Sequence, residues 1–125
     1  MIQSKDFLMR LLKDLAALLN KAIGSFPDNN LGITQADIDL QIYTATGLSK
    51  EDFLTLDDAG LEQAINQYDA QGSLLLIDFL ANLFYYQYQQ TGQKDLLTKA
   101  QTFYQRYQQQ SSTFSMVYFQ RIQQL

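Results

Sequence analysis

The sequence predicts an all-α domain of about five or six helices, packed as antiparallel hairpins around one central apolar helix at residues 74–90. Residues 74–88 read LLLIDFLANLFYYQY and are apolar on nearly every side of a helix, which is typical of a helix enclosed by neighbours. The segment contains Asp78 and is shorter than the roughly 20 residues that cross a bilayer. Apolar residues also recur at helical spacing before and after it.

Composition predicts a single folded domain over residues 1–125. Hydrophobic residues make up 46% of the chain and charged residues 18%, which is typical of a globular protein with its own core. Cysteine and histidine are both absent, so disulfides, thiolate metal sites and nucleophiles paired with histidine are excluded. We therefore expect no enzyme activity, no cofactor and no metal site, although a mechanism based on carboxylates stays open.

Charge is distributed unevenly along the chain. Residues 28–78 hold ten acidic side chains and one basic one, a net charge of −9, whereas residues 1–27 carry +2 and residues 79–125 carry +3. The acidic middle is expected to face solvent or to pack between the basic flanks. No run of basic residues indicates nucleic-acid binding. Basic residues interrupt the first leucine-rich segment, so it is not a signal peptide, and we expect a cytoplasmic protein without membrane contact.

The first helix is predicted over residues 4–23, within an N-terminal unit of residues 1–24. Ser4 is a plausible N-cap, and Gly24 and Pro27 mark the end of the helix and a loop. One wide apolar face follows from the helical spacing of Leu8, Leu11, Leu12, Leu15, Leu18, Leu19 and Ala22.

Short acidic helices are expected over residues 33–70. Helix starts are indicated at Thr34, at Ser49, and at Asp57 or Asp58, each followed by apolar residues. Residues 28–39 have a faint similarity to a calcium-binding loop, but Gly32 stands one place from the required glycine position. A loop leading to a helix cap is the better interpretation.

The last unit, residues 73–125, is predicted to hold a helical hairpin and one more helix. Ser73 can cap the central helix, and Gly92 allows only a short connection to the next helix at 94–109, so the two are antiparallel. A final helix follows, with caps offered by Ser111, Ser112 and Thr113 and with the apolar or aromatic residues Phe114, Val117, Tyr118, Ile122 and Leu125.

Asp78 and Asn82 are the most unusual polar residues, because they interrupt the apolar central helix. They form one narrow stripe with Gln89, which is expected to reach solvent. Two alternatives stay open. Asp78 could form a buried ion pair with one of the cations Arg10, Lys99, Arg106 or Arg121. It could also be the polar anchor of a ligand pocket between the first and central helices, with Asn82 beside it.

Tyrosine is concentrated in the last third of the chain, where six of the eight tyrosines fall between residues 85 and 118. A stripe of rings edged by glutamine could form a groove beside the hairpin for a partner helix or peptide. The candidate partner-binding residues are Tyr85, Tyr88, Tyr104, Tyr107 and Gln108. The alternative is that these rings complete the core.

The hairpin resembles a single tetratricopeptide hairpin. Residues 100–104, AQTFY, match the Ala and aromatic positions of its second helix, and Phe84 occupies the aromatic position sixteen residues earlier. Gln87, Tyr88 and Thr91 depart from the consensus, and no second copy lies 34 residues upstream. The opening MIQSKDFLMR, with LLTKA at 96–100, resembles an uncharacterised family of small bacterial proteins of unknown function that is associated with tetratricopeptide-like helices.

That resemblance implies an all-helical fold and a bacterial cytoplasmic source, and it implies no catalytic residues. Taken together, these features favour a non-enzymatic protein-interaction or adaptor module that binds a protein, a peptide or a second copy of itself. The alternative is a sensor that binds a small molecule between the first and central helices.

Overall fold

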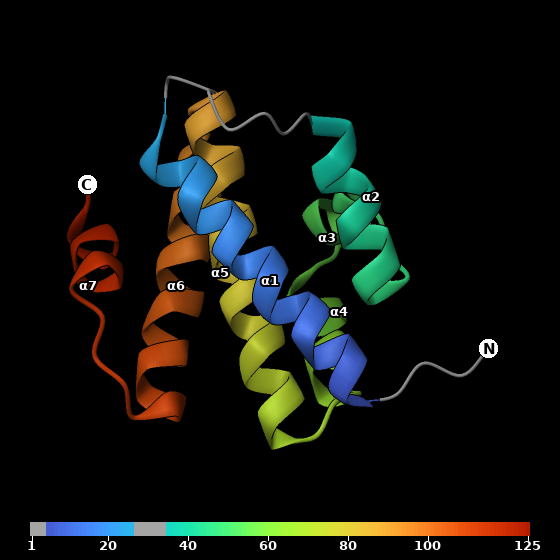
Figure 1. The fold of residues 1–125 in the computed structure, drawn as a ribbon. Coiled ribbons are helices and arrows are strands. Elements are labelled where there is room, and N and C mark those ends of the chain that lie inside the picture. Colours follow the sequence, from blue (N-terminus) through green and yellow to red (C-terminus); the bar gives the residue numbers. More distant parts are fainter. Residues whose placement is uncertain (1–4, 27–34) are drawn as a thin grey trace.

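The computed structural model describes residues 5–26 and 35–125, and within them the chain forms seven α-helices and no strand (Figure 1). The helices are α1 (Lys5–Gly24), α2 (Gln35–Thr46), α3 (Lys50–Thr55), α4 (Asp58–Asn66), α5 (Ala70–Thr91), α6 (Lys94–Ser111) and α7 (Met116–Gln123). The predicted all-α class is confirmed, but the predicted number of helices was too low. The expectations for Ser4, Pro27, Thr34 and the calcium-like loop fall outside the described residues.

Helix α5 is the centre of the molecule. It packs antiparallel against α6, whereas α1 crosses it in the same general direction, with Gln89 near the end of α5 donating to the carbonyl of Ile23 near the end of α1. Helices α4 and α7 lie on either side of this trio (Figure 1). Every side chain of residues 76–86 except Asp78 is buried. Burying each large apolar side chain contributes on the order of 1.5–3 kcal/mol, so this one helix supplies much of the stabilisation. Rings from its neighbours complete the core, with Phe53 edge-on to Phe79 and Phe103 stacked on Phe84.

The central helix begins earlier than predicted, at Ala70 rather than Leu74. Asp69 is the N-cap, because its carboxylate accepts the backbone N–H of Gly72 at 2.8 Å. Ser73, which was predicted to cap the helix, instead donates its hydroxyl to the carbonyl of Ile65 at 2.8 Å and ties α5 to α4. At the other end, Gly92 takes a φ of 74° and terminates the helix in the left-handed region.

Three helices, α2, α3 and α4, form in the acidic middle, and α3 and α4 each have their own start signal. Ser49 and Asp52 form a reciprocal capping box at α3. Asp57 caps α4 by accepting the N–H of Gly60 at 2.7 Å. Most acidic side chains here are exposed, and one of them, Glu62, pairs with Arg106 to connect α4 and α6.

Helix α7 folds back along α6. Ser115 is its N-cap and accepts the N–H of Tyr118 at 3.2 Å, so the predicted caps at residues 111–113 were wrong. The chain reverses at Ser112, and α7 then runs antiparallel to α6 on the outer side of the molecule (Figure 1). None of the helices formed by residues 5–26 and 35–125 is long and apolar enough to cross a membrane.

Candidate interaction site

The inner side of α7 carries polar groups, which is unusual for a helix that packs on a core. Tyr118 and Arg121 are its buried residues, and both reach toward Asn82 on α5. Asn20 on α1 and Tyr104 on α6 complete the cluster. Five residues from four helices therefore meet in one hydrogen-bonded network, which we call the Asn82 cluster.

Asn82 is the centre of this network and has no exposed surface. Its side-chain amide donates to the Asp78 carbonyl at 2.8 Å and to the Tyr118 hydroxyl at 3.0 Å. Its side-chain oxygen accepts the Tyr104 hydroxyl at 2.7 Å and an Arg121 N–H at 3.1 Å. Both polar atoms are thus satisfied, which is the condition for burying them without a large cost.

Arg121 brings a positive charge into this buried position. The same Nη1 also lies 2.7 Å from Asn20 Oδ1 and 2.8 Å from the Tyr104 hydroxyl. The guanidinium carbon is 5.1 Å from the ring centre of Tyr85, 5.5 Å from that of Tyr104 and 5.7 Å from that of Tyr118. Three rings around one cation form an aromatic cage, which offsets part of the loss of hydration.

Asp78 borders the cluster and supplies its negative charge. The Tyr118 hydroxyl donates to its carboxylate, and Asn82 donates to the same oxygen at 3.2 Å. Burial raises the pKa of Asp78 above its usual value, although the hydrogen bonds and Arg121 act in the opposite direction. Burial also raises the pKa of the Tyr104 and Tyr118 hydroxyls, so both stay protonated and act as donors at neutral pH.

The surroundings of Asp78 and Asn82 differ from the solvent-facing stripe that was expected. The expectation that their stripe reaches solvent was wrong for Asn82, which is fully buried, while Asp78 is partly buried. The stripe faces α1 and α7 instead, and Gln89 likewise donates to the carbonyl of Ile23 on α1. Arg121, one of the four cations considered as partners for Asp78, lies in the neighbouring Asn82 cluster, and its charge acts to lower the pKa of the Asp78 carboxyl.

The tyrosines predicted to edge a partner groove beside the hairpin belong to the core or pack against it, and α7 covers them. Tyr104 lies 4.4 Å from Tyr118 between ring centres, and Tyr107 lies 5.9 Å from the same ring. Tyr85 donates to Gln124, and Gln108 accepts the backbone N–H of Ser115 at 2.8 Å. Tyr85 and Tyr104 are buried, whereas Tyr88, Tyr107 and Gln108 are partly exposed. A partner could touch the buried rings only by displacing α7.

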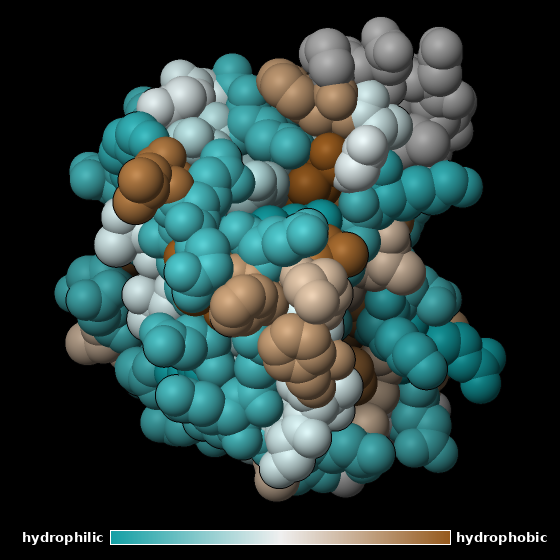
Figure 2. Space-filling view, turned by 90° about the vertical axis from the view of Figure 1, so that its left-hand side faces the viewer, coloured by the Kyte–Doolittle hydropathy of each residue, from teal (hydrophilic) through white to brown (hydrophobic). Residues whose placement is uncertain are grey.

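The outer side of α7 exposes apolar side chains (Figure 2). The exposed fractions are 66% for Phe114, 59% for Met116, 50% for Val117 and 40% for Phe119. We call these four residues the α7 face. Glutamines dominate the rest of this segment, and Arg121 is the only charged side chain of residues 107–125. The sequence analysis named Phe114 and Val117 among the apolar residues of the last helix but did not predict that they would be exposed.

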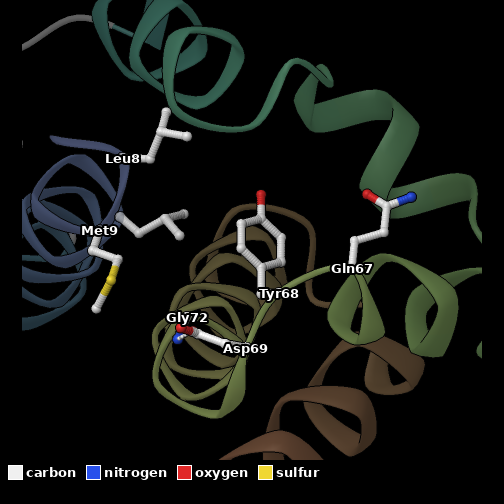
Figure 3. A pocket seen from close by; sticks show the side chains of 7 residues that line it. Leu8, Met9, Gln67, Tyr68, Asp69 and Gly72 are labelled. Carbon is white, nitrogen blue, oxygen red and sulfur yellow. Dashed lines mark hydrogen bonds between the residues drawn. The ribbon is translucent and has the colours of Figure 1, made fainter. Parts of the chain in front are cut away.

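A cavity of about 390 Å³ lies between α1 and the turn that leads into α5 (Figure 3). Leu8, Met9 and Leu12 line it from α1, and Gln67, Tyr68, Asp69 and Gly72 line it from the turn. The Tyr68 ring stands between the α1 side chains and Gln67 (Figure 3). Asp78 and Asn82, the residues expected to line a pocket between the first and central helices, do not line this cavity, and ligand binding there stays a prediction.

Comparisons with models of protein families, with curated proteins and with solved structures find no match for this chain. The likeness to small bacterial proteins with tetratricopeptide-like helices therefore stays a prediction. Within residues 5–26 and 35–125, no group of three or more acidic side chains gathers in a way that could hold a metal ion.

Proposed function

We propose that this protein is a non-enzymatic interaction module that binds a protein partner through the α7 face. The observation that carries the proposal is the orientation of α7. Its polar Tyr118 and Arg121 point inward, whereas its apolar Met116, Val117 and Phe119, together with Phe114 just before the helix, are exposed. Isolated exposed apolar residues are ordinary on protein surfaces, but a group of them on one short helix and the residues just before it is typical of a binding surface.

The composition of the α7 face supports a partner with an apolar and uncharged surface. Phenylalanine and methionine are enriched in interface cores, and charged residues are depleted there. The rings of Phe114 and Phe119 lie 5.8 Å apart and provide adjacent aromatic anchors. Because Arg121 is buried, no exposed charged side chain of residues 107–125 would have to be desolvated on binding.

The Asn82 cluster gives α7 a defined position before any partner binds. A preorganised surface loses less conformational entropy on association than a flexible one. The α5–α6 hairpin, with its resemblance to a tetratricopeptide hairpin, would then serve as the platform. In this proposal Tyr85, Tyr104, Tyr107 and Gln108 act on partner binding indirectly, by holding α7 in place. Tyr88 packs edge-on against Tyr85 and supports that ring.

The test uses variants that change the α7 face without touching the network beneath it. The double variant Val117→Ser, Phe119→Ser should lose a partner captured from cells that make the protein. Its free energy of unfolding should fall by no more than about 1 kcal/mol, because both side chains are half exposed. The matched control, Leu40→Ser with Tyr43→Ser, changes two exposed apolar residues on α2 and should keep the partner. Loss of the partner in the α2 control alone would overturn the proposal.

A second candidate function, binding of a small molecule, is favoured by the cavity between α1 and the α4–α5 turn. Its volume of about 390 Å³ lies in the range of ligand pockets, and leucine and methionine supply most of its α1 wall. The Tyr68 hydroxyl would be its polar group, since the Asp69 carboxylate is already committed to capping α5. A metabolite that raises the melting temperature of the native chain, but not of a cavity-filling Leu8→Phe variant, would support this function. No shift across a broad library would refute it.

A further inference from the structure

We propose that two copies of this chain exchange their α7 helices, each placing its own α7 in the tyrosine groove of the other. The proposal rests on the proposed function in one respect, because it names a second copy of the chain as a partner for the α7 face. It is carried by three features of the region from α6 to α7.

The first feature is the backbone at the reversal between α6 and α7. Ser112 has a φ of 55° and is the only non-glycine residue of the described chain with a positive φ. A residue with a Cβ is strained in this left-handed conformation. Residues 112–115 also form a short connection. Short strained hinges favour exchange, because a segment that crosses to a second copy no longer has to turn back at that residue.

The second feature is the set of specific contacts between α7 and the groove. The groove of a second copy offers the same contacts to this helix. Tyr118 and Arg121 bind groups on α1, α5 and α6, and none of those partner groups belongs to α7 itself. Gln101 on α6 holds the end of the segment by donating to the backbone oxygen of Gln124 at 2.6 Å. Exchange therefore keeps the whole Asn82 cluster, including the caged charge of Arg121, and leaves no buried polar group unpaired.

The third feature is where the exposed apolar residues lie. Phe114, Met116 and Val117 come directly after the hinge, and each is at least half exposed in the single chain. In an exchanged pair the two hinges pass each other, so these residues of both copies come together and cover one another. The exposed part of this segment is uncharged, so two identical copies meet without the repulsion that a charged surface would cause.

The absence of cysteine allows a direct test by disulfide trapping. Two variants of the full chain, Gln101→Cys and Gln124→Cys, are mixed at high concentration, left to equilibrate and then oxidised. Only exchange places Cys at position 124 of one copy beside Cys at position 101 of another, so a disulfide-linked heterodimer is expected. A mixture of Gln90→Cys with Gln124→Cys is the control for random collisions, because Gln90 is exposed on α5 and should give no such product.

Ser112→Gly provides the second measurement. Glycine adopts a positive φ without strain, so the variant should favour the closed single chain and weaken the exchanged dimer by roughly tenfold or more in light scattering. An unchanged dimer in this variant, or no heterodimer in the 101/124 mixture, overturns exchange. A further variant, Val117→Cys, tests the α7 face independently of helix exchange. If Val117→Cys alone forms a disulfide-linked homodimer while the 101/124 mixture does not, copies meet through the α7 face without exchanging.

Discussion

Asn82 shows how a residue that looks out of place in a sequence can organise a structure. It interrupts an apolar helix, and its side chain reaches groups from α6 and α7 as well as its own helix. Replacing it with an apolar residue would leave the Tyr104 hydroxyl and the Arg121 guanidinium each short of an acceptor. Unsatisfied buried groups cost more than the hydrogen bonds themselves contribute.

We therefore expect Asn82→Ala to lower the free energy of unfolding by about 2–4 kcal/mol. Urea denaturation followed by circular dichroism measures this change. Gln90→Ala, on an exposed position of the same helix, is the control and should stay within about 0.5 kcal/mol of the native chain. Equal effects of the two substitutions would show that the Asn82 cluster contributes little to stability.

Asp78 gives the structure a predictable response to pH. Because burial raises its pKa in the folded state, the folded protein binds this proton more tightly than the unfolded chain does. The stabilisation linked to this proton is fully present below the ordinary pKa of 3.8 and is lost as the pH rises through the raised value. The native chain should therefore gain stability relative to Asp78→Asn between about pH 7 and pH 4. Urea denaturation of both proteins at the two pH values measures this difference in the free energy of unfolding. A native chain that loses stability relative to Asp78→Asn as the pH falls would contradict the raised pKa.

At this scale the sequence marks Asp78 and Asn82 as unusual but does not predict their partners. Asp78 and Asn82 stand out because α5 is otherwise apolar, and Arg121 was one of four possible cations for Asp78. Their neighbours Tyr118 and Arg121 follow about 40 residues later in the chain. Which of the four cations is brought close depends on how α7 packs, and no local pattern encodes that.

Helix boundaries depend on which of several possible caps is used. The helical hairpin and its short connection at Gly92 were predictable, because apolar periodicity and a glycine C-cap are local signals. The start of α5 was not, because Asp69 and Ser73 are both good caps. The Ser73 hydroxyl is drawn to the carbonyl of Ile65 at the end of α4, which leaves Asp69 as the cap.

Removing this cap should cost a measurable amount. Asp69→Ala is expected to lower the free energy of unfolding by about 1 kcal/mol, because the N–H of Gly72 loses its acceptor. Gln71→Ala, an exposed position in the same first turn, should change it by less than about 0.5 kcal/mol. If the Gln71 variant is the less stable of the two, Asp69 is not the residue that starts α5.

The orientation of α7 shows the limit of hydrophobic patterning for a short element. Phe114 and Val117 are apolar residues of this last segment, yet both are exposed. The groove between α1, α5 and α6 presents Asn20, Asn82 and Tyr104, so a helix offering Tyr118 and Arg121 satisfies it better than an apolar side would. The chemistry of the receiving surface, which is known only after folding, decides which side of α7 is buried.

At the scale of the whole molecule, a central apolar helix is enclosed by its neighbours, and the last helix closes the groove that the hairpin leaves open. The class of fold and the central position of α5 follow from the sequence, because hydrophobicity around a full helical circumference demands burial. The occupant of the tyrosine groove does not follow, because the same rings would suit a partner helix and the chain's own α7 equally well.

Native-state hydrogen exchange is the most direct test of the claim that α7 is seated on α5 by the Asn82 cluster. The amides of residues 76–86 should exchange only through global unfolding, and those of α7 should be protected at a smaller free energy, through release of this helix alone. In Asn82→Ala the protection of α7 should fall further than that of α5. Amides of α7 that exchange without protection in the native chain, or lose none of it in the variant, would contradict the account.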